Sequence, residues 1–171
     1  MKTVIDSVLP RDFLQLLGIY VQLCAHIEKM CWHTLATLEG VDWTDDRQAA
    51  NMVSLRKKTQ NLLKALKAGS ETSPEAIKDR LKAVMDRIEA GIEERHMAVH
   101  GAWSRGSRPD TYRVDYFTNT SGDYRNPVWG AYHHIDFTQA QLAETVSGAD
   151  FILRELAEIQ HHLHSSAPSE S

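Results

Sequence analysis

The chain has 171 residues, of which 42 % are hydrophobic and 25 % are charged, and its formal net charge is -4. These values fit a globular chain with one substantial core and exclude a fibrous or largely disordered protein. The negative charge disfavours broad electrostatic binding to nucleic acid, although it is compatible with a local basic groove. No apolar run approaches the length of a membrane helix, and residues 1–6 lack the apolar core of a signal peptide, so we expect a cytoplasmic protein without a membrane partner.

Hydrophobic residues recur at three- and four-residue spacing over residues 13–38, which predicts a long helix that other elements cover on much of its circumference. Cys24 and Cys31 lie on one side of this helix but too far apart to bridge each other, so we expect reduced core thiols. Glu28 lies between the two cysteines in the row of apolar residues on that side of the helix. A carboxylate in that position is expected to be paired or to face a cleft.

A second helix is predicted over residues 45–68 and a third from residue 74 to His100. The second presents a basic face formed by Arg56, Lys57, Lys58, Lys64 and Lys67. Lys57 and Lys64 are candidate contacts to an RNA backbone, although a solvated helix face is the better explanation. In the third helix, Arg95 occupies the position where the apolar spacing places the next core residue. Gly101 is expected to end this helix by adopting a positive φ.

Beyond Gly101 the composition changes to aromatic, β-branched and turn residues, which predict a β-hairpin with strands at 111–117 and 128–137 joined through 119–123. Thr138 and Gln141 form a capping box that starts the last helix. Residues 165–171 are expected to be a disordered tail. The sequence therefore predicts one mainly α domain over residues 1–164, an antiparallel four-helix bundle with a β-hairpin inserted before the last helix.

The end of the third helix carries a cluster of cationic side chains. His96 and His100 are one turn apart on a shared face, whereas Arg95 and His100 lie about 140° apart around the axis. One helix alone therefore does not bring Arg95 and His100 together. Two copies that met across a two-fold axis would line one cleft with both residues from both chains, so we expect a homodimer.

These residues resemble a known family. The segment Arg95-His96-Met97-Ala98-Val99-His100 fits the R-x4-6-H motif of HEPN domains, and Glu94-Arg95-His96 followed by His100-Gly101-Ala102-Trp103 is similar to the branch with an E-R-N-x-x-x-H-G-x-W pattern. Members of this family are small α-helical bundles that dimerise. Many are metal-independent endoribonucleases of toxin–antitoxin and phage-defence systems, and others bind RNA or support a partner enzyme. The resemblance implies an RNase or RNA-binding component whose partners are RNA and an antitoxin or partner enzyme, and it implies no cofactor.

The resemblance also implies roles for individual side chains. Arg95 would hold the phosphate, and His100 would act as general acid or base in the attack of a ribose 2′-hydroxyl. His96 stands where the family pattern has Asn, so it either orients the phosphate or titrates as well. Glu28 and Glu94 are the candidate supporting carboxylates. The aromatic and cationic region that follows adds Arg105 and Arg108 as candidate RNA contacts, although packing within the hairpin explains that region almost as well.

Two other interpretations remain open at this point. Arg95 would be a structural partner of Glu28 or of another carboxylate if the chain were a non-catalytic helical interaction protein. Alternatively, Glu93, His96 and His100 have the spacing of helical metal ligands, which would resemble DinB-like four-helix metalloproteins. Arg95 would then bring positive charge near a cation, so we expect no bound metal.

Overall fold

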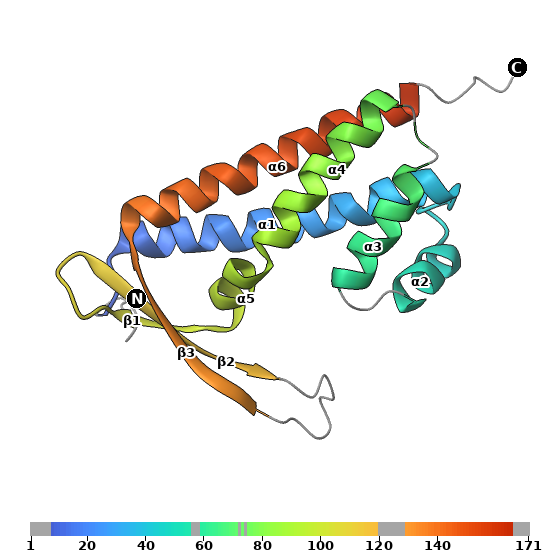
Figure 1. Ribbon diagram of the computed structural model, residues 1–171. Coiled ribbons are helices and arrows are strands. Elements are labelled where there is room, and N and C mark those ends of the chain that lie inside the picture. The colour runs from blue at the N-terminus through green and yellow to red at the C-terminus, as the bar shows by residue number, and fades with distance from the viewer. Residues whose placement is uncertain (1–7, 56–58, 72, 74, 120–128, 166–171) are drawn as a thin grey trace, which may run out of the picture. The chain divides into compact units, whose positions relative to one another are not determined.

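The computed structural model describes residues 8–55, 59–71, 73, 75–119 and 129–165 (Figure 1). In chain order the elements are α1 (Arg11–Glu39), α2 (Asp46–Leu55), α3 (Thr59–Ser70), α4 (Glu75–Ala90), α5 (Ile92–His100), β1 (Ala102–Arg105), β2 (Thr111–Asn119), β3 (Trp129–Thr138) and α6 (Gln139–Ser165). The chain is mainly helical with a small three-stranded antiparallel sheet, which confirms the predicted class. Within the described residues, no helix is both long and apolar enough to cross a membrane.

The chain forms two compact units. The first, here called the sheet unit, comprises Met1–Gln22 and Ile92–Gly148; the second, the helical unit, comprises Leu23–Gly91 and Ala149–Ser171. The long helices α1 and α6 each contribute one part to each unit.

The helical unit is built around the packing of α3 against α4 and around parts of α1 and α6. Its buried residues include Leu62, Leu63 and Leu66 of α3 and Ile77, Leu81, Val84 and Met85 of α4. Cys24 and Cys31 are both buried and are not joined by a disulfide, as predicted. Lys67, a member of the predicted basic face, is 2.7 Å from Glu89 Oε2 and 3.4 Å from Asp86 Oδ1. Part of that face is therefore neutralised by α4.

The sheet unit has the strand order β1-β2-β3, and both strand pairs are antiparallel. Because side chains alternate along a strand, Tyr112, Val114 and Tyr116 of β2 share one face, here called the inner face, and all three are buried. Met97 of α5 packs on Val114 and Tyr116. Phe13 of α1 covers the other end of this face, with its ring centroid 4.0 Å from that of Tyr112.

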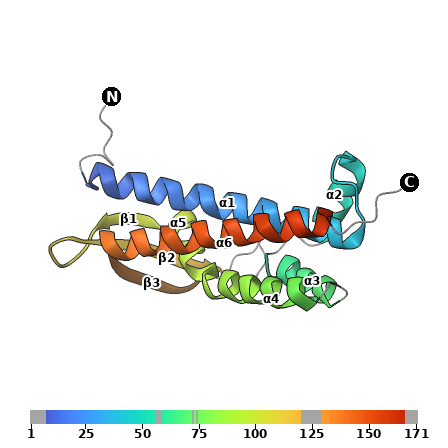
Figure 2. The same ribbon diagram turned by 90° about the horizontal axis from the view of Figure 1, so that it is seen from above.

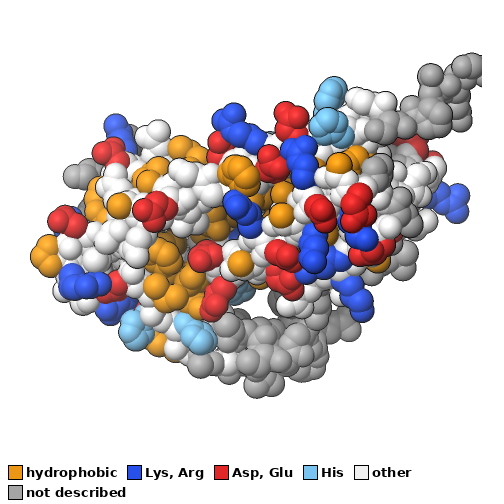
Figure 3. Space-filling view, turned by 45° about the horizontal axis from the view of Figure 1, so that its top comes forward, with side chains coloured by type: hydrophobic (Ala, Val, Ile, Leu, Met, Phe, Trp, Pro, Cys, Tyr) orange, Lys and Arg blue, Asp and Glu red, His pale blue; other side chains and the backbone are white. Residues whose placement is uncertain are grey.

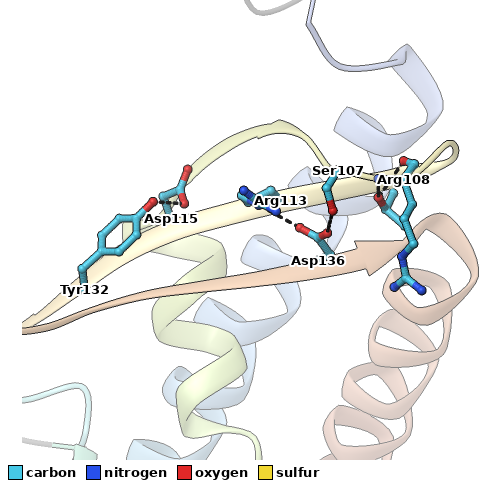
Figure 4. A network of polar contacts seen from close by, with 7 residues as sticks. Ser107, Arg108, Arg113, Asp115, Tyr132 and Asp136 are labelled. Carbon is cyan, nitrogen blue, oxygen red and sulfur yellow. Dashed lines mark hydrogen bonds and ion pairs between the residues drawn. The ribbon is translucent and has the colours of Figure 1, made fainter.

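The opposite, outer face of the sheet carries a polar network (Figure 4). Arg113 Nε donates to Asp136 Oδ1 at 2.9 Å, and Ser107 Oγ donates to Asp136 Oδ2 at 2.9 Å. These two contacts hold the pKa of Asp136 down at about 2, with Arg113 as the larger cause. The Tyr132 hydroxyl donates to Asp115 on the neighbouring strand. The network ties β3 to β2 and to the connection after β1.

The capping box that starts the last helix is confirmed. The backbone N–H of Thr138 donates to Gln141 Oε1 at 2.9 Å, and the backbone N–H of Gln141 donates to Thr138 Oγ1 at 3.2 Å. The two predicted strands are β2 and β3, and β3 leads directly into α6. Most of the predicted turn at 119–123 and residues 166–171 of the predicted tail lie outside the described residues.

The predicted second helix corresponds to α2 and α3, and residues 56–58 between them, including Lys57, lie outside the described part. Two features differ from the prediction, the end of the third helix and the presence of a third strand. The third helix ends at Ala90, and a separate helix, α5, begins after Gly91. The break at this glycine changes which of the following residues face the core. Met97 and Ala98 are therefore the buried residues of α5, and Arg95 is only half-buried. Strand β1 was not predicted because four residues are too few to show an alternating pattern.

A glycine is required at position 101, after α5, for a different reason from the one predicted. Among the described residues, positive-φ glycine conformation is found at Gly40 and not at Gly101. A Cβ atom on Gly101 would instead overlap Val114 Cγ2 and lie 2.5 Å from the Met97 carbonyl oxygen. Glycine is required here because the end of α5 approaches β2 so closely.

We expect Gly101→Ala to destabilise the protein by about 1–3 kcal/mol, because the added methyl group must displace Val114 or the end of α5. Gly148→Ala in α6 is the matched control, since a Cβ there meets no atom within 4 Å. That variant should gain about 0.4–1 kcal/mol by restricting the unfolded chain. Urea unfolding of both variants measures the difference, and equal stabilities would refute the close approach.

Candidate active site

Helix α5 carries the motif residues on its solvent side. Met97 and Ala98 are buried against the sheet, Arg95 is half-buried, and His96 and His100 are exposed. The anchor at Met97 therefore fixes which way the rest of the helix faces. His96, one residue before this anchor, and His100, three residues after it, are turned toward solvent, where a substrate can reach them.

The two motif histidines lie next to each other. The ring centroids of His96 and His100 are 5.0 Å apart, with 51° between the ring planes. This is the separation expected of residues one helical turn apart. Two imidazoles at this distance can contact neighbouring atoms of one substrate, and imidazole both accepts and donates protons near neutrality.

The sheet adds a tyrosine and a third histidine to this pair. The ring of His96 meets the ring of Tyr116 edge-on at 6.1 Å, and Tyr116 is stacked on His133 at 5.1 Å with 21° between the planes. Tyr116 and His133 are directly opposite each other in the β2–β3 register. The rings of His100, His96, Tyr116 and His133 thus form one continuous row from α5 to β3.

Sequence reasoning did not select His133. The sequence His133-His134 offers two adjacent histidines, and strand alternation sends them to opposite faces of the sheet. The register identifies His133 as the one on the inner face, opposite Tyr116. The signal that could have found it is its pairing with Tyr116, because both are in phase with the buried residues of the predicted hairpin.

Glu93 fixes the tyrosine in the middle of the row. The Tyr116 hydroxyl donates to Glu93 Oε1 at 2.7 Å. Burial and the acceptor carboxylate together raise the pKa of Tyr116 to about 12, with burial as the larger cause. Tyr116 therefore stays protonated at neutral pH and serves as a rigid donor. Because Glu93 lies in the first turn of the helix that carries both motif histidines, this hydrogen bond also links α5 to β2.

The spacing of Glu93, His96 and His100 suggested metal ligands as an alternative. Across the described ranges, no three His, Cys, Asp or Glu side chains are arranged to hold a metal ion. The Glu93 carboxylate is instead the acceptor for Tyr116.

The remaining candidate residues are distributed over both units. Glu94 is exposed on α5, Arg105 is exposed at the end of β1, and Arg108 is exposed in the connection to β2. Glu28 and Lys64 belong to the helical unit, where Glu28 is half-buried and Lys64 is exposed. The sheet unit thus brings together Arg95, His96 and His100 on one helix.

The charge of Glu28 acts on a thiol of its own helix. The pKa of the Cys31 thiol is raised to about 12, first by burial and second by the charge of Glu28. Cys31 is therefore a protonated thiol, not a nucleophile. Glu28 is the neighbouring charge that strengthens this effect.

We expect spectrophotometric titration to show one tyrosine that ionises only near pH 12, and Tyr116→Phe to remove it. Glu93→Gln should lower the pKa of Tyr116, while burial keeps it above the ordinary value of about 10. Because the folded-state pKa is raised, the stabilisation from neutral Tyr116 is complete below about pH 10 and is lost as the pH rises toward 12. Glu94→Gln removes the same charge from an exposed position and should leave the titration unchanged; an equal shift in both variants would contradict the assignment.

No protein-family model, no curated protein and no solved structure matches this chain.

Proposed function

We propose that this protein is a HEPN-like, metal-independent endoribonuclease whose acid–base groups are the exposed histidines of α5. The observation that carries the proposal is the pair of neighbouring imidazoles, His96 and His100, on the solvent side of the helix that also bears Arg95. Phosphodiester transesterification needs a proton acceptor, a proton donor and positive charge near one phosphate. Arg95, His96 and His100 are side chains of these types, and all three belong to α5.

The proposed reaction is an internal displacement at phosphorus. A neutral imidazole takes the proton of the ribose 2′-hydroxyl, and the 2′-oxygen forms a bond to the adjacent phosphorus. The bond from phosphorus to the 5′-oxygen of the next nucleotide breaks, and a protonated imidazole delivers its proton to that oxygen. The products are a 2′,3′-cyclic phosphate and a 5′-hydroxyl end, and the two imidazoles exchange protonation states.

Arg95 is assigned to the phosphate. A guanidinium presents several fixed N–H donors, and charge-assisted hydrogen bonds to phosphate oxygens strengthen as negative charge develops there. Its half-buried position also fits a structural role, which keeps a second candidate function open. In that alternative the chain is an RNA-binding or interaction protein without catalysis, and Arg95 holds the fold together.

The proposal includes a four-helix bundle of the HEPN kind and a cytoplasmic location. It also includes a role in a toxin–antitoxin or phage-defence system, in which the partners are RNA and an antitoxin or partner enzyme. A homodimer is part of it as well, because Arg95 and His100 point in different directions around one helix. In the sheet unit, the side chains of Arg105 and Arg108 are proposed to contact the RNA backbone. In the helical unit, Lys57 and Lys64 are proposed to do so.

We expect the purified protein to cleave single-stranded RNA in the presence of EDTA and to leave 2′,3′-cyclic phosphate ends. His100→Ala and Arg95→Ala should each reduce the cleavage rate by about 100-fold or more, because proton transfer and charge stabilisation each contribute factors of this size. Gel assays with end-group analysis of the products measure both effects.

His161→Ala is the matched control, since His161 is an exposed histidine at the far end of α6 and should be dispensable. Circular dichroism shows whether each variant is folded. If the wild-type protein cleaves no RNA and Arg95→Ala unfolds it, the arginine is structural and the enzymatic proposal is wrong.

A further inference from the structure

The outer edge of β3 is not paired within the described chain. β3 is the last strand of the sheet, and its one strand neighbour is β2 (Figure 2). A free edge of this kind presents unpaired backbone N–H and C=O groups on alternate residues. Proteins commonly protect such edges with lysine or proline, and neither occurs between Trp129 and Thr138. The edge is thus open to pairing with another strand.

Hydrophobic side chains are exposed beside this edge. Tyr132 and Ile135 of β3 are 53 % and 38 % exposed, and Phe117 of β2, which is opposite Tyr132 in the register, is 54 % exposed. The space-filling view shows hydrophobic and histidine side chains at the surface of the sheet region (Figure 3). Exposed apolar groups next to unpaired backbone groups favour association.

The sequence of β3 is complementary to itself in one antiparallel register. If a two-fold axis passes through Ile135, each Ile135 faces its own copy, and His134 of each strand faces Asp136 of the other. Strand alternation places His134 and Asp136 on the same, outer face, so the two contacts can form together. Registers centred on His134 or His133 pair no histidine with a carboxylate.

Asp136 keeps acceptor capacity for this contact. Its oxygens accept hydrogen bonds from the side chains of Arg113 and Ser107 and from the backbone of Ser107. A carboxylate offers about four acceptor positions, so a histidine from a second strand can be added. The low pKa of Asp136 means that it is charged at neutral pH.

We infer that a second copy of this chain docks antiparallel on β3, with the two-fold axis at Ile135, and that the two sheets become one sheet of six strands. The interface stands independently of RNA cleavage. The next step rests on the proposed function, because there the interface defines how the sites of two copies would share one substrate.

In such a dimer the inner faces of both sheets lie on the same side. The two β2 strands, each carrying an α5, are three strand spacings apart, or about 14 Å. Helices in direct contact are about 8–10 Å apart, so the two α5 helices would leave a groove between them. The floor of that groove is formed by the two β3 strands, and His133 of each copy faces it. This is the shared cleft that Arg95 and His100 require.

The test is the mass of the full chain in sedimentation equilibrium. We expect a dimer at micromolar concentration, and we expect Ile135→Lys to halve the mass by placing a charge against its own copy. Ile19→Lys is the matched control, because Ile19 of α1 is a comparably exposed isoleucine, at 41 %, outside the interface. The control should remain a dimer.

Cysteine crosslinking tests the register and does not depend on the lysine variant folding. Facing residues have Cα atoms about 4.5–5.5 Å apart, which suits a disulfide, so Ile135→Cys should crosslink when a mild oxidant removes two electrons and two protons from the paired thiols. Tyr132→Cys places its two thiols six residues apart along the strands, about 20 Å, and should not crosslink. The native thiols are buried and serve as background.

A monomeric wild-type protein, or a dimer that Ile135→Lys leaves intact and Ile135→Cys does not crosslink, would overturn the inferred interface. The outcome is separable from the proposed function. A crosslinked dimer that cleaves no RNA supports the interface and refutes the nuclease, whereas RNA cleavage by a dimer that Ile135→Lys leaves intact does the reverse.

Discussion

The sheet unit depends on one close contact, the packing of the end of α5 on β2. Met97 lies against Val114 and Tyr116, and the absence of a side chain on Gly101 allows the helix end to reach Val114. Met97 is the buried anchor of α5, and His96 and His100 are exposed on the same short helix. The chemistry of the site therefore follows from a packing constraint and from the helical spacing of its residues.

Tyr116 links this constraint to the site. Its hydroxyl donates a hydrogen bond to Glu93 at the start of α5, and its ring contacts the rings of His96 and His133. A single residue thus positions histidines from two distant parts of the chain. Since its pKa is raised far above neutrality, it holds them without exchanging protons itself. Proton transfer in the proposed reaction is left to the imidazoles.

Much of the fold could be read from local patterns, and the errors have physical causes. The capping box at Thr138 and the buried thiols depend on nearby residues, and they were predicted correctly. The break at Gly91 was missed because the apolar spacing continues through it. β1 was missed because it is held mainly by pairing with β2, a contact that no local pattern records. His133 was missed for the same reason, since only the register distinguishes it from His134.

The central claim is that the RNA's own 2′-hydroxyl is the nucleophile and that the histidines of α5 move its proton. The most direct measurement uses an oligonucleotide that is cleaved at one site and a second that differs by a single 2′-deoxy nucleotide on the 5′ side of that bond. We expect the modified bond to resist cleavage while other bonds in the same strand are still cut. Cleavage of the modified bond at the normal rate would show that another nucleophile attacks phosphorus, and it would contradict the account.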